Sequence, residues 1–183
     1  MKIFLVRHGE TEWNAKRKVC GMLEADLSEN GRMQAQLLAD YIAKHKDELK
    51  IEAIYTSPLR RARETALPIE KALGLEATVE YDLHEVNFGE KDGTDWDDPE
   101  FKAFKAEPFK RFPGGESASD AVQRSYNLLD GLRRKHSGNI LLVAHATIIR
   151  IMDTYFHSRT MEEYKAFRPA NCQMIEYETT QLK

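Results

Sequence analysis

The chain has 183 residues, 42% of them hydrophobic and 31% charged, with a formal net charge of −3. This length and composition predict one globular domain, and the negative balance argues against a dedicated nucleic-acid binder, which normally carries a basic excess. No apolar run approaches a membrane span, and the four apolar residues before Arg7 are too few for the core of a secretory signal. Cys20 and Cys172 give neither a disulfide framework nor metal-ligand spacing. We therefore expect a cytoplasmic protein without a metal or other cofactor that contacts neither nucleic acid nor membrane; the sequence leaves its oligomeric state open.

Short apolar runs alternate with amphipathic stretches along the chain. The runs that predict strands are Ile3–Val6, Ala53–Thr56, Thr78–Tyr81, Ile140–Ala144 and Met174–Tyr177. Helical spacing of apolar residues predicts helices over Gly31–Lys44, Leu59–Leu73, Ser117–Lys135 and Thr147–Phe156. Ser28 is expected to cap the first helix, and Pro68 to break or restart the second after two turns. The alternation predicts an α/β fold, a three-layer sandwich with a central, mostly parallel sheet and helices on both faces.

One stretch, residues 89–115, does not follow this alternation. It is rich in Asp, Lys and Pro, and its phenylalanines are irregularly spaced, at Phe101, Phe104, Phe109 and Phe112. We interpret it as a lid-like excursion from a single domain that spans residues 1–183. Its phenylalanines suggest an apolar wall, which would favour a leaving group with some apolar surface.

Three predicted strands run into residues that can bind or transfer a phosphoryl group. Arg7 and His8 follow the first strand, His145 follows the fourth, and Arg60 opens the helix after the second. In open α/β sheets, ligands bind outside the carboxyl ends of the strands, so these side chains are expected to meet at one edge. Taken one at a time, each of these side chains is equally consistent with an ordinary surface residue that forms hydrogen bonds.

Together these residue types suit phosphoryl transfer. Guanidinium groups match phosphate oxygens in bidentate geometry, and a neutral imidazole is a competent nucleophile near neutral pH. Backbone N–H groups at helix N-termini add further donors. Such a site can neutralise a transferring phosphoryl group without a metal, because positioning and electrostatic stabilisation are the main tasks.

These residues also lie in motifs that resemble the histidine phosphatase superfamily, in its phosphoglycerate mutase-like branch. The motifs are RHGETEWN at 7–14, Gly21, DLSENG at 26–31, SPLRRARETA at 57–66, LHEVNFG at 83–89, PGGES at 113–117 and VAH at 143–145. They follow the family's order and span nearly the whole chain, so the ordered set is highly specific.

The resemblance implies a role for each matching residue. His8 would be the nucleophile that becomes phosphohistidine, and Glu85 would protonate the leaving oxygen and then activate water, since acid and base roles exchange between the two steps. The residues implied in catalysis are His8, Glu85, Arg7, Arg60 and His145. Those implied in binding phosphate or substrate are Arg7, Asn14, Cys20, Gly21, Arg60, His145, Ala146 and Thr147.

Two departures from the family pattern bear on the substrate. Ala146 replaces the glycine that usually follows the second histidine, which would add strain if that position needs a positive φ. Lys91 stands where many members carry tryptophan, either as a contact to a substrate anion or as a solvated lysine.

The expected activity is metal-independent hydrolysis of small phosphate monoesters through phosphohistidine. The substrate would be a small phosphorylated metabolite, such as a phosphosugar, a phosphorylated hydroxy acid or α-ribazole phosphate. Mutases of the family carry a longer insertion with an arginine pair, whereas this interval holds Lys102, Lys105, Lys110 and Arg111 without that pair. Mutase-type phosphoryl transfer and a phosphate-binding module without turnover remain the alternatives.

Overall fold

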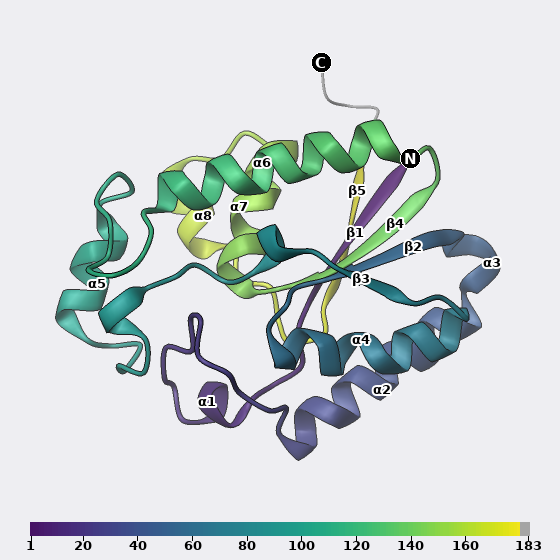
Figure 1. Ribbon diagram of the computed structural model, residues 1–183, viewed down its shortest axis with the longest axis horizontal. Helices are drawn as coiled ribbons and strands as arrows, with labels where there is room; N and C mark the ends of the chain where they lie inside the picture. The colour runs from purple at the N-terminus through teal and green to yellow at the C-terminus, as the bar shows by residue number, and fades with distance from the viewer. Residues whose placement is uncertain (180–183) are drawn as a thin grey trace.

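The computed structural model describes residues 1–179, which fold around a five-stranded sheet (Figure 1). The strands are β1 (Lys2–Arg7), β2 (Ile51–Thr56), β3 (Ala77–Val79), β4 (Asn139–Ala144) and β5 (Met174–Glu178). Their spatial order is β3-β2-β4-β1-β5; the first four strands are parallel and β5 pairs antiparallel with β1. The five expected strands and the mostly parallel sheet are confirmed.

Helices cover both faces of this sheet. The helical elements are α1 (Glu12–Ala15), α2 (Glu29–Lys44), α3 (Lys46–Leu49), α4 (Arg60–Leu73), η1 (Tyr81–Leu83), η2 (Gly89–Lys91), α5 (Pro99–Ala106), α6 (Ala118–Lys135), α7 (Ala146–Phe156) and α8 (Met161–Ala166). Helices α2 and α4 lie on one side of the sheet, and α6 and α7 on the other (Figure 1). The three-layer sandwich is therefore confirmed.

The alternation of side chains along β1 shows how one strand serves two cores. Ile3 and Leu5 belong to the core that includes α6 and α7, whereas Phe4 and Val6 belong to the core beneath α2 and α4. All four are almost completely buried. A strand buried on both faces reads as an uninterrupted apolar run, which is how this segment appears in the sequence.

The helix boundaries agree closely with the sequence, with one correction. Ser28 caps α2, because its hydroxyl accepts a hydrogen bond of 3.0 Å from the backbone N–H of Gly31. The expected break at Pro68 is wrong: α4 is a single helix across it. Ile69 beyond the proline is buried in the same core as Ala62 before it, so packing holds both halves in line and offsets the loss of one helical hydrogen bond.

The excursion 89–115 contains η2 and α5 and extends beyond one end of the sheet, on the left in Figure 1. Most of its phenylalanines join the hydrophobic core on the α6 and α7 side of the sheet. Phe88 meets the rings of Phe101 and Phe112 edge-on, with centroids 5.1 Å apart in each pair, while Phe109 faces solvent. The lid-like role of this segment stays a prediction. Among residues 1–179, no helix combines the length and apolarity needed to cross a membrane.

Candidate active site

Two histidines meet where the central parallel strands end. The register of β1 and β4 pairs Arg7 with Ala144, so the residues that follow, His8 and His145, emerge side by side. Their ring centroids are 5.1 Å apart, and both side chains are almost fully buried. The pairing of neighbouring strands thus produces the convergence that the sequence predicted for these two residues.

The surroundings of His8 fix its tautomer. Its Nδ1 lies 2.7 Å from the backbone oxygen of Gly9, which can only accept, so Nδ1 carries the proton and Nε2 keeps its lone pair. Burial, together with the charges of Arg61 and Arg7, lowers the pKa of His8 well below its ordinary value. The ring is therefore neutral and offers Nε2 as a nucleophile.

His145 is oriented by Ser57. The Ser57 hydroxyl accepts a 3.3 Å hydrogen bond from the N–H of Leu59 and lies 2.7 Å from Nε2 of His145. If the hydroxyl donates to Nε2, the proton of the neutral ring resides on Nδ1. This Nδ1 is buried and has no hydrogen-bond partner among the described residues. Burial, followed by the charge of Arg61, lowers the pKa of His145 well below its usual range.

Two guanidinium groups lie close to the histidines, that of Arg61 fully buried and that of Arg7 half-buried. Arg7 donates through Nη1 to the carbonyl of Pro169 at 2.9 Å. Arg61 donates through Nη1 to Leu23 at 2.9 Å and through Nη2 to Gly21 at 2.7 Å. The Nε atoms of both arginines are buried and unpaired within residues 1–179. Burial lowers the pKa of both side chains.

The placement of Arg61 corrects the sequence interpretation, which assigned this role to Arg60. The Arg60 side chain is 57% exposed and forms an ion pair with Asp26 at 2.8 Å, whereas Arg61 is 1% exposed. Adjacent residues of a helix point about 100° apart, so only one can face the site. The signal was available: Arg61 lies four residues before Thr65 and eight before Ile69, on the buried stripe of α4.

Glu85 reaches the same region from the loop after η1. Its Oε1 accepts a hydrogen bond of 2.8 Å from its neighbour Val86, and its Oε2 accepts one of 3.2 Å from the N–H of Thr147 in the first turn of α7. The residue is only 8% exposed. The carboxyl group is therefore held in one orientation at the edge of the site.

The remaining predicted positions lie around these groups. Asn14, Cys20, Gly21, Ala146 and Thr147 line the pocket. Cys20 donates to the Leu23 carbonyl at 3.2 Å, and burial raises the pKa of its thiol, which fits a packing residue. Ala146 is the first residue of α7 and does not have a positive φ, so its replacement of glycine adds no strain.

Gly21 is required for close packing. Its φ is +48°, and a Cβ there would lie 1.7 Å from Oδ1 of Asp92. Its carbonyl accepts from Arg61, so the tight approach of this loop supports the buried guanidinium. Lys91, considered as a substrate contact, instead pairs with Glu100 and does not line the pocket.

These residues form the inner end of a pocket of about 640 Å³. Of the predicted residues, Arg60 and His145 are absent from its lining; His145 is fully buried, with its ring 5.1 Å from that of His8. Three buried nitrogen atoms, Nε of Arg7, Nε of Arg61 and Nδ1 of His145, have no partner among the described residues and belong to residues next to the neutral His8 ring, a set suited to a tetrahedral anion. Within the described part of the chain, no group of three His, Cys, Asp or Glu side chains is placed to hold a metal ion.

Sequence reasoning missed several pocket residues. Besides Arg61, they include Trp96 and Lys105 from the excursion and Arg150, Tyr164 and Arg168 from the region of α7 and α8. Arg150 and Tyr164 follow helical patterns that give no reason to single them out, and Arg168 lies in a loop. Only the three-dimensional fold brings them to one cavity.

Comparison with known proteins matches residues 3–182 to the family model of the histidine phosphatase superfamily (branch 1). Phosphoglycerate mutase-like protein 4 of Arabidopsis thaliana is 37% identical over 161 residues, covering 81% of this chain and 68% of that protein. Phosphoserine phosphatase 1 of Hydrogenobacter thermophilus is 36% identical over 160 residues, covering 83% and 74%.

Solved structures with the same fold include two phosphatases. A mycobacterial glucosyl-3-phosphoglycerate phosphatase in complex with VO3 superposes with a TM-score of 0.85 at 25% identity, covering 99% of this chain and 94% of that one. A phosphoserine phosphatase variant from Entamoeba histolytica in complex with phosphoserine gives a TM-score of 0.81 at 27% identity, covering 96% and 89%.

Proposed function

The chain belongs to branch 1 of the histidine phosphatase superfamily, and on that premise we propose that it hydrolyses small phosphate monoesters through a phosphoryl group carried by Nε2 of His8. As a member of this family it is a phosphomonoesterase. The observation that carries the proposal is the fixed tautomer of His8, which leaves Nε2 free in a site where Arg7 and Arg61 each keep an Nε without a partner among the described residues.

In the first step, Nε2 of His8 attacks the phosphorus atom and the bond to the ester oxygen breaks. Glu85, as a carboxylic acid, gives its proton to the departing oxygen, which leaves as an alcohol. Guanidinium N–H groups of Arg7 and Arg61 and the Nδ1–H of His145 stabilise the equatorial oxygens, because charge on them is shared by buried donors that need no rearrangement.

In the second step, the carboxylate of Glu85 takes a proton from water, and the oxygen of that water attacks the phosphoryl group. The P–N bond breaks, inorganic phosphate leaves, and Nε2 of His8 regains its lone pair. The net reaction consumes one water and yields one alcohol and one phosphate. Asn14, Gly21 and the N-terminus of α7 at Ala146 and Thr147 complete the phosphate surroundings.

Among substrates, we propose phosphoserine and related phosphorylated hydroxy acids as the first group to examine. Two sequence relatives are named phosphoserine phosphatases, and the Entamoeba histolytica structure was solved with phosphoserine. The relative named as mutase-like keeps 3-phosphoglycerate isomerisation as the alternative.

The test is phosphate release from p-nitrophenyl phosphate, phosphoserine and 3-phosphoglycerate with EDTA present. Wild type is compared with His8→Ala and with a matched control, His45→Ala. His45 also bonds a backbone carbonyl through Nδ1, that of Tyr41 at 2.8 Å, but it is the C-cap residue of α2 and does not line the pocket. Release that survives EDTA and His45→Ala but is lost in His8→Ala supports the proposal. Full release from His8→Ala refutes it, as does isomerisation of 3-phosphoglycerate without any release.

A further inference from the structure

The outer part of the pocket is strongly basic. Besides the two arginines of the reaction centre, its basic lining residues are Arg17, Lys18, Lys102, Lys105, Arg150, Lys165 and Arg168, and within residues 1–179 its only acidic ones are Glu85 and Asp97. The whole chain, by contrast, carries a net charge of −3. Positive charge is thus concentrated at this cavity against the balance of the molecule, which favours anionic ligands.

Several of these cations already have acidic partners. Asp97 pairs with Arg17 at 2.8 Å and with Lys102 at 2.7 Å, and Lys18 pairs with Asp95 at 2.9 Å. Lys105, Arg150, Lys165 and Arg168 form no ion pair with any described residue, and of these cations Arg150 and Arg168 are the ones whose charges act on Lys105.

Lys105, Arg150 and Arg168 come from different elements and line the same pocket. Lys105 lies on α5, Arg150 on α7 and Arg168 in the loop after α8. Burial, and then the positive charges of Arg150 and Arg168, lower the pKa of Lys105 to about 8. Its ammonium lies over the rings of Phe88 and Phe101, 5.8 and 5.2 Å from their centroids. Like charges held together without a counterion repel, and an anion between them relieves that cost.

The backbone that carries Arg168 is anchored on both sides. The carbonyl of Phe167 accepts from Nε of Arg150 at 2.9 Å, and the carbonyl of Pro169 accepts from Arg7 at 2.9 Å. Arg150 in turn lies over the ring of Tyr164, 5.3 Å from its centroid. Arg7 of the reaction centre and Arg150 of the outer pocket therefore each hold the loop that carries Arg168.

We propose that the outer pocket is a second anion-binding subsite, formed by Lys105, Arg150 and Arg168, and that the preferred substrates carry a carboxylate or a second phosphate on the leaving group. This inference rests on the proposed phosphatase function. The apolar wall expected from the excursion stays a prediction beside it, since Phe101 and Trp96 line the pocket whereas Phe104, Phe109 and Phe112 do not. Guanidinium and ammonium groups together suit either anion.

The test uses substrate pairs that differ only in the second anion. One pair is 3-phosphoglycerate and glycerol 3-phosphate, in which a carboxylate replaces a hydroxymethyl group. The other is propane-1,3-diol bisphosphate and its monophosphate. We expect wild type to prefer the anionic member of at least one pair by about tenfold in kcat/KM, the effect of one charge-assisted contact. The pair that shows the preference identifies the anion.

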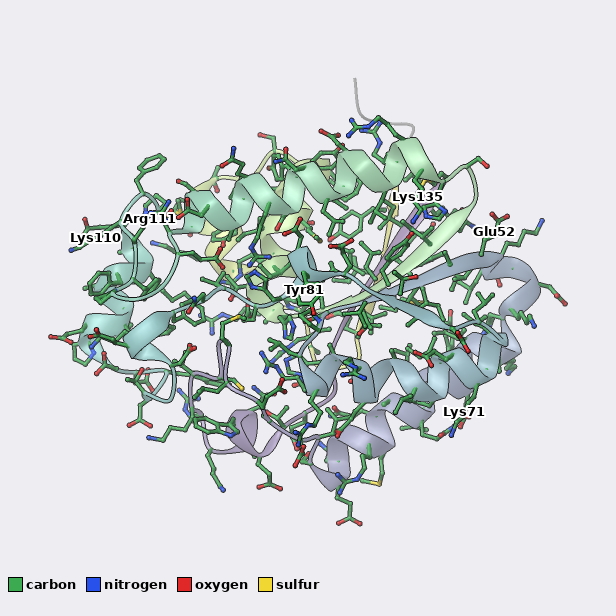
Figure 2. All side chains as sticks on the ribbon, viewed as in Figure 1. Glu52, Lys71, Tyr81, Lys110, Arg111 and Lys135 are labelled. Carbon is green, nitrogen blue, oxygen red and sulfur yellow. The ribbon has the colours of Figure 1, made fainter. Side chains whose placement is uncertain are left out.

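Lys105→Met and Arg168→Gln are expected to bring this ratio close to unity while leaving the neutral members nearly unchanged. Both residues are exposed overall, although the ammonium end of Lys105 is desolvated within the pocket, so neither variant should unfold the protein. The matched control is Lys110→Met, which must keep the ratio. Lys110 also lies over a phenylalanine ring of the excursion, 4.7 Å from the centroid of Phe104, but it points outward (Figure 2) and lies outside the pocket.

Different outcomes disprove the anion-binding subsite and the phosphatase function. If p-nitrophenyl phosphate is hydrolysed through His8 but neither pair shows a preference, the subsite is refuted and the phosphatase stands. A preference that survives in both pocket variants, or is lost equally in Lys110→Met, also refutes the subsite. If no ester is hydrolysed at all, the proposed function itself has failed.

Discussion

Replacing Arg60 and Arg61 by alanine, one at a time, tests which of these adjacent arginines binds the phosphoryl group. Arg61→Ala removes a buried guanidinium that has an unpaired Nε and faces the reaction centre. Arg60→Ala removes an exposed side chain whose only side-chain partner in the described region is Asp26. The two variants lose the same number of atoms one residue apart.

The expected magnitudes differ by orders of magnitude. Loss of one or two charge-assisted hydrogen bonds of about 1.5–3 kcal/mol each predicts a fall in kcat/KM of roughly 10- to 10⁴-fold for Arg61→Ala. An exposed ion pair contributes about 0–1 kcal/mol, so Arg60→Ala should stay within about fivefold of wild type. Hydrolysis of p-nitrophenyl phosphate in the presence of EDTA measures both.

Arg61 also supports the loop at Gly21, so stability must be measured alongside activity. Its removal leaves the buried carbonyl of Gly21 without its donor, at about 1–3 kcal/mol, whereas the carbonyl of Leu23 keeps its hydrogen bond from Cys20. Arg61→Lys keeps the charge but loses the planar fork and should lie between wild type and Arg61→Ala in activity. Equal losses in Arg60→Ala and Arg61→Ala, with both variants folded, would refute the assignment.

Three further predictions concern pH and packing. Burial and two neighbouring guanidinium groups lower the pKa of His8. Its ring should therefore stay neutral, with the proton on Nδ1, at pH values around 6, below the usual pKa of about 6.5. ¹⁵N NMR of the imidazole measures this protonation state. Burial raises the pKa of Asp92 to about 6. Between pH 4 and 6 the folded chain therefore holds a proton that the unfolded chain has already released, and the stability of the wild type falls as pH rises from about 4 to 6. Because Asp92→Asn cannot titrate at this position, its Tm relative to wild type should increase across that window. In Gly89→Ala the new Cβ would lie 2.0 Å from a backbone oxygen at φ +56°, so urea unfolding should show a larger loss than Gly74→Ala, where φ is +69° and the space is open.

Each of these has an outcome that contradicts it. Protonation of His8 near pH 6.5 would mean that its ring is not held neutral by its surroundings. A Tm difference for Asp92→Asn that does not change with pH would mean that this carboxyl group does not titrate in the window. Equal losses in the two glycine variants would mean that the base of the excursion adapts freely.

Much of the fold could be predicted because its strands are buried on both faces. Such strands appear as short apolar runs, and the residues that follow them lie at one sheet edge by the rule for parallel strands. His8 and His145 were located in this way. Pro68 was misjudged because a local rule was applied where the packing of Ile69 and its neighbours on the sheet decides the outcome.

The site was harder to predict where the answer depends on orientation. Motif order alone placed an arginine at the start of α4. Choosing Arg61 over Arg60 requires knowing which side of the helix is buried. The spacing of apolar residues in the sequence indicates that side, but the assignment to Arg60 did not take it into account. Lys105, Arg150 and Arg168 are a different case. They are far apart in the chain and follow no shared pattern, so only the tertiary fold brings them together.

The central claim, a phosphoryl group on His8, is tested most directly by rapid mixing of Glu85→Gln with p-nitrophenyl phosphate, followed by peptide mass spectrometry. p-Nitrophenolate leaves without help from an acid, whereas hydrolysis of phosphohistidine needs the carboxylate, so the intermediate should accumulate. The account predicts a burst of p-nitrophenolate equal to the enzyme concentration and one added phosphoryl group on the peptide that contains His8. Turnover without a phosphorylated peptide, or a phosphoryl group on another residue, would contradict it.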